Sequence, residues 1–360
     1  MKSFAILPFI ASAALAAVAN VPTSIVDADK DVSDAGVSKD QIVAKFVESS
    51  DGSKIYAEAV GDPSNPPLVF VPGYTISTMA FDKQFENETM REQLYMVRFD
   101  PRGHGQSVMN ASEDAHKSEL YADDFKAVLS AFNMEKPVFA AWSLGGAMLT
   151  DIIVNIGTDA ISGYISIAAI PYIGDVLSEV VSESTMEIVP GMQVSNSTDD
   201  WKKNAISFED SLFYDPKAVP FDFKAALIGA AAQEPSDVTK IVIGREQDSD
   251  KFKELIKDAS IPMLAINGKQ DSQRISGEAI VDSMKKYWSE DLITFTEVDK
   301  AGHAFFYDQP EEANEQFRAF TLKSTGHEDQ IAAANNNGAS SAALPSLFAL
   351  STLLLSAFIL

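Results

Sequence analysis

Short apolar runs alternate with helical patterns along most of the chain, and this alternation constrains the fold more than any other feature. Apolar runs of this length are typical of central strands in a parallel sheet that is covered on both faces. Alternating strands and helices predict an α/β fold with right-handed crossovers. The runs lie at 67–71, 94–99, 137–142, 163–167, 262–266 and 292–295, and helical patterns lie at 121–132, 144–156 and 309–320.

Two segments depart from this alternation. Residues 54–60 alternate apolar and polar side chains after the turn signal Asp51-Gly52, which predicts an antiparallel edge or hairpin strand. About 90 residues between Ile170 and Ile261 contain helical candidates at 223–233 and 250–258 but no parallel strand. We interpret residues 171–260 as a helical lid over the active face.

The two ends of the chain look like targeting segments. Residues 1–19 (MKSFAILPFIASAALAAVA) combine one lysine, an apolar run and small residues at the end, which predicts a secretory signal peptide rather than a buried helix or membrane anchor. The tail 338–360 ends in 14 mostly apolar residues, too few for the roughly 20 of a spanning helix. It resembles a GPI-attachment signal, with Asn337 or Gly338 as the attachment site; a plain tail anchor is the alternative.

The remaining boundaries follow from these predictions. Residues 20–41 are expected to be a linker and 326–337 a stalk, which leaves 42–170 and 261–325 for the core domain. The protein is therefore expected at the cell surface, held to the membrane by a lipid anchor. Three sequons agree with secretion, and their candidate glycosylation sites are Asn87, Asn110 and Asn196.

Composition excludes several classes of function. The chain has 360 residues with 52 acidic and 28 basic side chains, and its formal net charge of −24 argues against a nucleic-acid partner. The absence of cysteine excludes disulfide scaffolds, cysteine-ligated metals and thiol nucleophiles. Neither a histidine-based metal motif nor a glycine-rich nucleotide fingerprint is present, so we expect no metal and no cofactor.

The segment Ala141-Trp142-Ser143-Leu144-Gly145 matches the G-x-S-x-G nucleophile elbow, with alanine in place of the first glycine. It lies where an apolar run ends and a helical pattern begins. The small residues allow the strained turn to pack closely, and the turn exposes the serine hydroxyl. Ser143 is therefore the candidate nucleophile, although a surface serine on a turn of small residues is the alternative.

A serine nucleophile needs a general base, and four histidines are available. His327 lies in the terminal linker, His116 lies in a polar loop where we expect it to be solvated, and His104 belongs to the segment Asp100–Ser107. His303, in a loop after the last strand and before the last helix, is the candidate base.

The base needs a carboxylate partner, and an ester carbonyl needs hydrogen-bond donors. Asp271 follows the strand at 262–266 and is the candidate orienting acid, with Asp175 as the alternative. The backbone N–H groups of Tyr74 and Leu144 are the expected oxyanion hole.

Taken together, these segments resemble the α/β-hydrolase superfamily, within it the cofactor-free serine hydrolases that include esterases, lactonases and perhydrolases. The resemblance covers roughly residues 42–325 outside most of the lid. It implies a mostly parallel eight-stranded sheet with helices on both faces, and a structural rather than catalytic role for His104. One departure is Pro72, where relatives commonly carry histidine. By analogy, the chain also resembles secreted, GPI-anchored fungal hydrolases.

The expected function is hydrolysis of carboxylic esters through Ser143, His303 and Asp271, with an acyl-enzyme intermediate. Perhydrolysis or acyl transfer at the same site, and a non-enzymatic surface binder, are the alternatives. The aromatic residues of the lid favour a partly apolar small-molecule ester, whereas the acidic surface mildly disfavours anionic substrates. The oligomeric state is left open.

Overall fold

The computed structural model describes residues 23–25, 41–194 and 196–331. Its centre is a nine-stranded sheet in the order β1-β2-β3-β5-β4-β6-β7-β8-β9. The strands β5, β4, β6, β7, β8 and β9 run parallel to one another, whereas β3 is antiparallel to both β2 and β5. The predicted mostly parallel sheet of an α/β fold is therefore confirmed.

Each of the six apolar runs forms a parallel strand. The strands begin or end within three residues of the predicted limits, and their bounds are β4 (Pro67–Val71), β5 (Tyr95–Phe99), β6 (Val138–Trp142), β7 (Gly163–Ile167), β8 (Met263–Gly268) and β9 (Ile293–Val298). The first five have fully or almost fully buried side chains, as expected for strands covered on both faces.

The N-terminal side of the sheet differs from the prediction in two ways. Strand β3 (Lys54–Val60) forms the predicted hairpin with β2 (Ile42–Glu48), but it lies inside the sheet because β5 covers its other side. The short strand β1 (Thr23–Ile25) pairs with β2 within the segment that we expected to be entirely linker. An unpaired edge offers free backbone N–H and C=O groups, and even three residues can use them.

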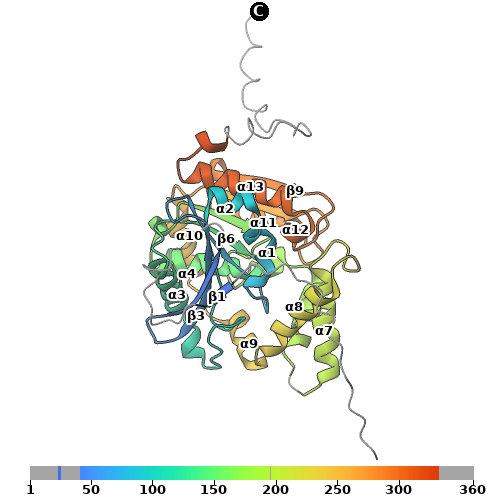
Figure 1. Ribbon diagram of the computed structural model, residues 1–360. Coiled ribbons are helices and arrows are strands. Elements are labelled where there is room, and N and C mark those ends of the chain that lie inside the picture. Colours follow the sequence, from blue (N-terminus) through green and yellow to red (C-terminus); the bar gives the residue numbers. More distant parts are fainter. Residues whose placement is uncertain (1–22, 26–40, 195, 332–360) are drawn as a thin grey trace, which may run out of the picture.

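Helices cover both faces of the sheet (Figure 1). Helices α3 (Ser118–Ala131) and α4 (Met148–Asn155) pack together on one face, and α1 (Asp82–Phe85), α2 (Glu88–Gln93) and α13 (Pro310–Ser324) pack together on the other. Helix α13 begins at Pro310 with Glu311 and Glu312 in its first turn, which suits the fixed φ of proline and the positive end of the helix dipole. Helix α11 (Gly277–Lys285) contacts β8, and the short α12 (Phe305–Asp308) precedes α13.

Between β7 and β8 the described residues form helices and no strand. These helices are α5 (Leu177–Val180), α6 (Glu183–Met192), α7 (Thr198–Ser211), α8 (Phe221–Gln233), α9 (Ser236–Gly244) and α10 (Ser249–Lys257). Helices α7, α8 and α9 lie together at one end of the molecule (Figure 1). The predicted all-helical character of the insertion therefore agrees with the structure.

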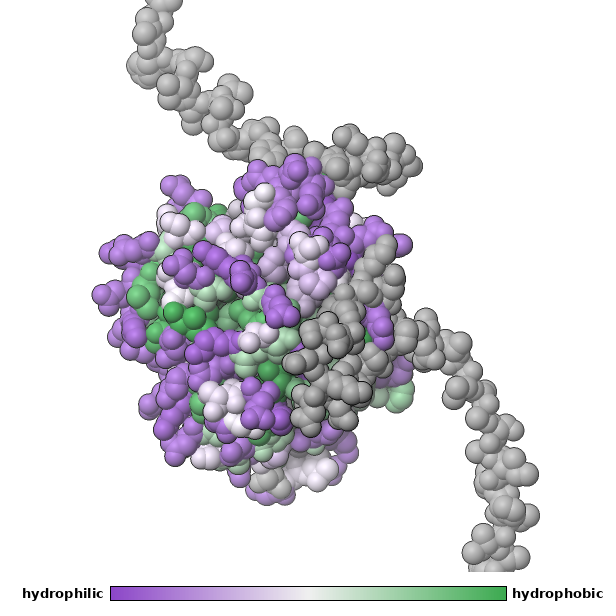
Figure 2. All heavy atoms as spheres, turned by 60° about the vertical axis from the view of Figure 1, so that its left-hand side comes forward, coloured by the Kyte–Doolittle hydropathy of each residue, from purple (hydrophilic) through white to green (hydrophobic). Residues whose placement is uncertain are grey.

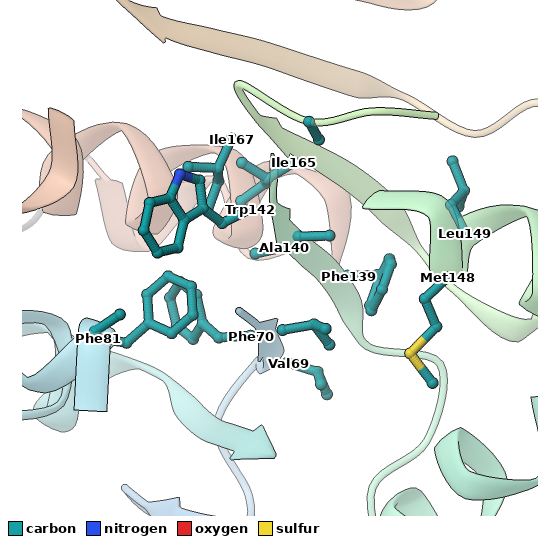
Figure 3. Close-up of a cluster of buried hydrophobic side chains, with 14 of the residues drawn as sticks. Val69, Phe70, Phe81, Phe139, Ala140, Trp142, Met148, Leu149, Ile165 and Ile167 are labelled. Carbon is teal, nitrogen blue, oxygen red and sulfur yellow. The ribbon is translucent and has the colours of Figure 1, made fainter. Parts of the chain in front are cut away.

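The hydrophobic core lies between the sheet and its helices. Figure 3 shows three side chains clustered on one side: Phe70 of β4, Trp142 of β6, and Phe81 from the 3₁₀ turn Thr78–Phe81. Phe139 and Met148 lie nearby on the other side. Phe70 and Phe81 have ring centroids 4.9 Å apart, and all of these side chains are buried. Most of the surface in Figure 2 is hydrophilic, in keeping with the charge of the chain.

Candidate active site

Ser143 lies at the end of β6, in the sharp turn that the elbow motif predicts. Its φ is +54°, in the left-handed region that side chains other than glycine rarely adopt, and the chain continues as a 3₁₀ turn (Ser143–Ala147) into α4. Gly145 and Gly146 must be small because neighbouring loops approach them closely. A Cβ on Gly145 would lie 2.3 Å from the carbonyl oxygen of Pro72, and one on Gly146 would lie 2.6 Å from the Cβ of Ala169.

Asp271 and His303 form a buried hydrogen-bonded pair. The Nδ1 atom of His303 lies 2.8 Å from Oδ2 of Asp271, and the backbone N–H of Gln273 donates to the other carboxylate oxygen at 2.8 Å. Burial raises the pKa of Asp271, but His303, Arg274 and the Gln273 N–H together hold it below its usual range. Burial lowers the pKa of His303, and the Asp271 carboxylate offsets part of that shift. The pair thus favours a neutral imidazole beside an ionised carboxylate.

Two glycines allow the Asp271 and His303 loops to meet. A Cβ on Gly268 would lie 2.0 Å from the carbonyl oxygen of Gly302, and a Cβ on Gly302 would lie 2.8 Å from Phe213 at the end of the α7 segment. The Ala304 N–H also donates to the Leu212 carbonyl at 2.7 Å. The His303 loop is therefore held between the β8 loop and the helical insertion.

The structure brings His303 next to the elbow without a hydrogen bond to Ser143. The indole Nε1 of Trp142 donates to the His303 carbonyl at 3.1 Å, and the two rings lie 5.5 Å apart between centroids. The Nε2 atom of His303 is buried and has no hydrogen-bond partner among the described residues. Catalytic hydrogen bonds are often long or misaligned before substrate binds, so this geometry is compatible with a base at His303.

Arg274, which was not among the candidate residues predicted from the sequence, contacts Ser143 directly. Its Nη2 atom donates to Oγ of Ser143 at 3.0 Å, and the side chain is 4% exposed. Its backbone is fixed, since Arg274 forms an isolated β-bridge with Val181 and the Ile275 N–H donates to Val180. Sequence reasoning missed this residue because three positions after Asp271 an arginine resembles any solvated loop cation. Its proximity to the candidate acid was the one available signal.

The loop after β4 contacts the other side of Ser143. A Cβ on Gly73 would lie 2.9 Å from the Ser143 Cβ, so the loop comes as close as the backbone allows. Among the turn and loop hydrogen bonds of the described residues, none uses the N–H groups of Tyr74 or Leu144 as a donor. The Tyr74 side chain is buried against Phe208 of α7, and its hydroxyl accepts a hydrogen bond from Gln193 at 3.2 Å.

The segment Asp100–Ser107 forms a buried structural turn. The Asp100 carboxylate accepts from the N–H groups of Thr78 at 2.7 Å and Gln106 at 2.8 Å, and Arg102 pairs with Asp124 through two hydrogen bonds. His104 is buried, burial lowers its pKa to about 4, and its Nδ1 atom lies 3.4 Å from the Arg102 carbonyl oxygen. These contacts agree with the structural role that the resemblance implies.

The structure places the other candidates away from the Asp271–His303 pair. His116 is 2% exposed and contacts the hydroxyl of Tyr121 and the carbonyl of Asn110, so the expected solvated side chain was a wrong prediction. The polar residues next to His116 in the sequence indicated an exposed side chain, but Tyr121 of α3 and the Asn110 loop bury the ring. Asp175 is exposed and interacts with Tyr172, and the ring of His327 contacts Thr325.

The structure describes only some of the residues on which the targeting predictions rest. Asn110 and Asn196 are exposed, whereas Asn87 is half-buried and caps α2 by accepting from the Met90 N–H. Residues 1–19, Asn337 and Gly338 lie outside the described residues. Within the described part of the chain, no helix has the length and apolarity needed to cross a bilayer, and no group of three acidic or histidine side chains is arranged to hold a metal.

The sequence model described as "Alpha/beta hydrolase family" matches residues 68–316. The chain belongs to this family. That stretch of the alpha/beta hydrolase begins in β4 and includes the elbow, the insertion, Asp271 and His303.

The chain is similar to known proteins both in sequence and in structure. "Probable oxidoreductase EphD" of Mycobacterium tuberculosis is 32% identical over 98 residues, which are 27% of this chain and 16% of that protein, so the chain matches only a small part of that relative. The esterase RhEst1 from Rhodococcus sp. ECU1013 superposes with a TM-score of 0.68 at 23% identity, over 77% of this alpha/beta hydrolase and 98% of that chain. A bromoperoxidase from Bacillus anthracis superposes with a TM-score of 0.65 at 18% identity, over 78% and 99% of the two chains.

Proposed function

We propose that this alpha/beta hydrolase is a serine hydrolase that cleaves carboxylic esters. The observation that carries the proposal is the buried Asp271–His303 hydrogen bond of 2.8 Å beside a serine at φ +54°. An imidazole oriented by a carboxylate next to a serine in a strained turn is the arrangement that acyl transfer needs. The similarity to an esterase of the same fold supports this reaction class.

In the proposed first half-reaction, the Ser143 oxygen attacks the ester carbonyl carbon while Nε2 of His303 takes the hydroxyl proton. The negative charge that develops on the carbonyl oxygen is held by the Tyr74 and Leu144 N–H groups. When the tetrahedral intermediate collapses, the bond to the alcohol oxygen breaks and His303 returns the proton to the leaving alcohol. In the second half-reaction, water attacks the acyl-enzyme carbonyl while His303 takes a proton from it. The bond to the Ser143 oxygen then breaks, His303 returns the proton to that oxygen, and the acid is released.

Asp271 has a supporting role in this proposal. It holds the His303 ring in the tautomer that carries hydrogen on Nδ1, which leaves Nε2 to accept the serine proton, and it stabilises the imidazolium that forms. The lowered pKa of Asp271 keeps the carboxylate ionised throughout the reaction.

Two hydrophobic contacts make the insertion a candidate lid. Phe208 packs on Tyr74, and Phe213 packs on Tyr307 with ring centroids 5.2 Å apart. Ser143 is 7% exposed and His303 is 0% exposed, so substrate entry requires these helices to move. Of the lid aromatics, Phe208 and Phe213 are buried, Trp201 and Phe223 are half-buried, and Tyr214 and Phe221 are exposed.

The proposal is tested with a fluorophosphonate probe that labels activated serines. We expect the purified protein to be labelled, and we expect the Ser143→Ala variant to lose labelling while Ser178→Ala, which changes an exposed serine, keeps it. Labelling that persists in Ser143→Ala would refute the assignment of the nucleophile.

Perhydrolysis is the second candidate, and the similarity to a bromoperoxidase of the same fold favours it. The acyl-enzyme would be the same, but hydrogen peroxide instead of water would accept the acyl group. Comparing the yield of peracid with that of free acid at rising peroxide concentration separates the two reactions.

We also propose that the enzyme acts at the cell surface. The apolar N-terminal segment ending in Ala17-Val18-Ala19 and the small-residue tail near Asn337 support this proposal. Release of the protein from intact cells by a phosphatidylinositol-specific phospholipase C would test it, and retention after treatment would count against the lipid anchor.

A further inference from the structure

Among the described residues, Arg274 is a buried cation without a bonded anion, and it contacts the proposed nucleophile directly. Four other buried arginines each form an ion pair with a carboxylate: Arg98, Arg102, Arg245 and Arg318. For Arg274 no carboxylate lies within ion-pair distance among the described residues, although Asp271 acts on it from farther away. A buried charge without a bonded partner is costly to keep, so its presence calls for a functional reason.

The guanidinium also has unused hydrogen-bonding capacity. Its Nε donates to the Ala168 carbonyl at 3.0 Å, its Nη1 to the Gln273 carbonyl at 3.2 Å and its Nη2 to the Ser143 oxygen. All three acceptors are neutral. A guanidinium has five N–H groups, so two of them have no partner within the described part of the chain. Burial lowers the pKa of Arg274 to about 10, and the Asp271 carboxylate offsets only part of that shift.

The sheet order places this cation on the other side of Ser143 from the loop that carries Tyr74. Strand β6, which ends at Ser143, lies between β4 and β7. Tyr74 follows β4 on one side, whereas Ala168, which anchors the guanidinium, follows β7 on the other side. Arg274 therefore approaches the serine from the side opposite Tyr74, where a different part of a bound ester would lie.

We propose that Arg274 binds a carboxylate of the substrate, so that the preferred esters carry an anionic carboxylate near the scissile carbonyl. The inference rests on the proposed ester hydrolysis and specifies its substrate class. A planar carboxylate matches the fork of N–H groups that guanidinium presents. The charge of −24 on the whole chain slows the approach of anions at low salt, but the buried cation decides which bound substrate is stabilised.

The test compares two ethyl esters of the same diacid, one with a free carboxylate and one without. The substrates are monoethyl glutarate, which keeps a free carboxylate, and diethyl glutarate, which does not, with released ethanol as the readout. We expect kcat/KM of the protein to favour the monoester, and we expect Arg274→Gln to reduce this preference about 100-fold, the loss typical of a hydrogen bond to a charged group. Arg274→Lys should keep part of the preference, because it keeps the charge but loses the fork.

Lys202→Gln is the matched control, because it removes an exposed positive charge from α7. This variant should keep the full preference for the monoester. If Arg274 merely positions Ser143, Arg274→Gln will lower kcat/KM for both esters by the same factor and the ratio will stay constant, which overturns the inference. A protein with no preference for the monoester overturns it as well.

Binding to Ser143→Ala separates this inference from the proposed function. Calorimetry should show that monoethyl glutarate binds to Ser143→Ala and that adding Arg274→Gln abolishes binding. Arg274-dependent binding without hydrolysis of any ester by the unaltered protein would refute the proposed function and leave the anion site standing. Hydrolysis of both esters at equal rates would support the proposed function and refute the anion site.

Discussion

The Nδ1 atom of His303 lies 2.8 Å from a carboxylate oxygen of Asp271, although 32 positions separate the two residues in the chain. Adjacent parallel strands produce this contact, because Asp271 follows β8 and His303 follows β9 at the same edge of the sheet. Because Gly268 and Gly302 have no side chain, the backbones of the two loops can pack closely against each other and against the insertion.

Asp271→Asn should lower kcat by about 10⁴-fold, because an amide at this position favours the wrong tautomer of His303. The unaltered enzyme should lose kcat/KM only as pH falls below about 6.5, since burial lowers the pKa of His303 and the neutral imidazole is the base. A pH–rate profile on a neutral ester measures both effects. Asp175→Asn, which changes the alternative acid, is the control and should be as active as the unaltered enzyme.

Gly268→Ala should separate the Asp271 and His303 loops. The new Cβ would lie 2.0 Å from the Gly302 carbonyl oxygen, and backbone atoms at this distance must move. A displacement near 1 Å in a catalytic group can reduce the rate by about 100-fold. Activity measured beside the thermal midpoint should show this loss in Gly268→Ala but not in Gly229→Ala, whose Cβ on α8 would meet no atom within 4 Å. Equal activity of the two variants would contradict the close packing.

Glu209 should make the fold less stable as pH rises. This carboxyl on α7 is fully buried without a side-chain hydrogen bond, and burial raises its pKa to about 8. The folded chain keeps the proton that the unfolded chain releases near pH 4.5, so the stabilisation is complete below that pH and is lost as pH approaches 8.

Glu209→Gln should remove this loss and raise stability at pH 8 relative to the unaltered protein, by up to a few kcal/mol. Urea unfolding at pH 4.5 and pH 8 would measure the difference. Glu254→Gln, on an exposed position of α10, should leave the pH dependence unchanged. An unaltered pH dependence in Glu209→Gln would show that another group is responsible.

Asp151→Asn should loosen the end of the helical insertion. Arg245, which follows α9, donates two hydrogen bonds to the Asp151 carboxylate of α4 and lies 3.8 Å from the Tyr121 ring centroid. Removing one partner leaves a buried charge, which typically costs about 3–5 kcal/mol of unfolding free energy. Asp159→Asn breaks an exposed pair with Lys136 and should cost less than about 1 kcal/mol. Chemical unfolding of both variants tests this contrast.

The core of the fold could be predicted from the sequence because its signals are local. The apolar runs and the helical pattern at 309–320 each depend on neighbouring residues, and each was found close to its predicted bounds. The prediction was weaker where partners decide the outcome. Segment 54–60 lies inside the sheet because β5 pairs with it, and His116 is buried because Tyr121 and the Asn110 loop cover it.

By itself, the sequence determined the α/β fold and the turn at Ser143, because short periodic patterns and small residues act through bonds and near neighbours. Only the tertiary structure decided that Arg274 lies against the Ser143 hydroxyl and that no carboxylate of the described residues is bonded to it. Residues 131 positions apart meet there because the order of strands in the sheet, and not their order in the chain, sets which loops share an edge.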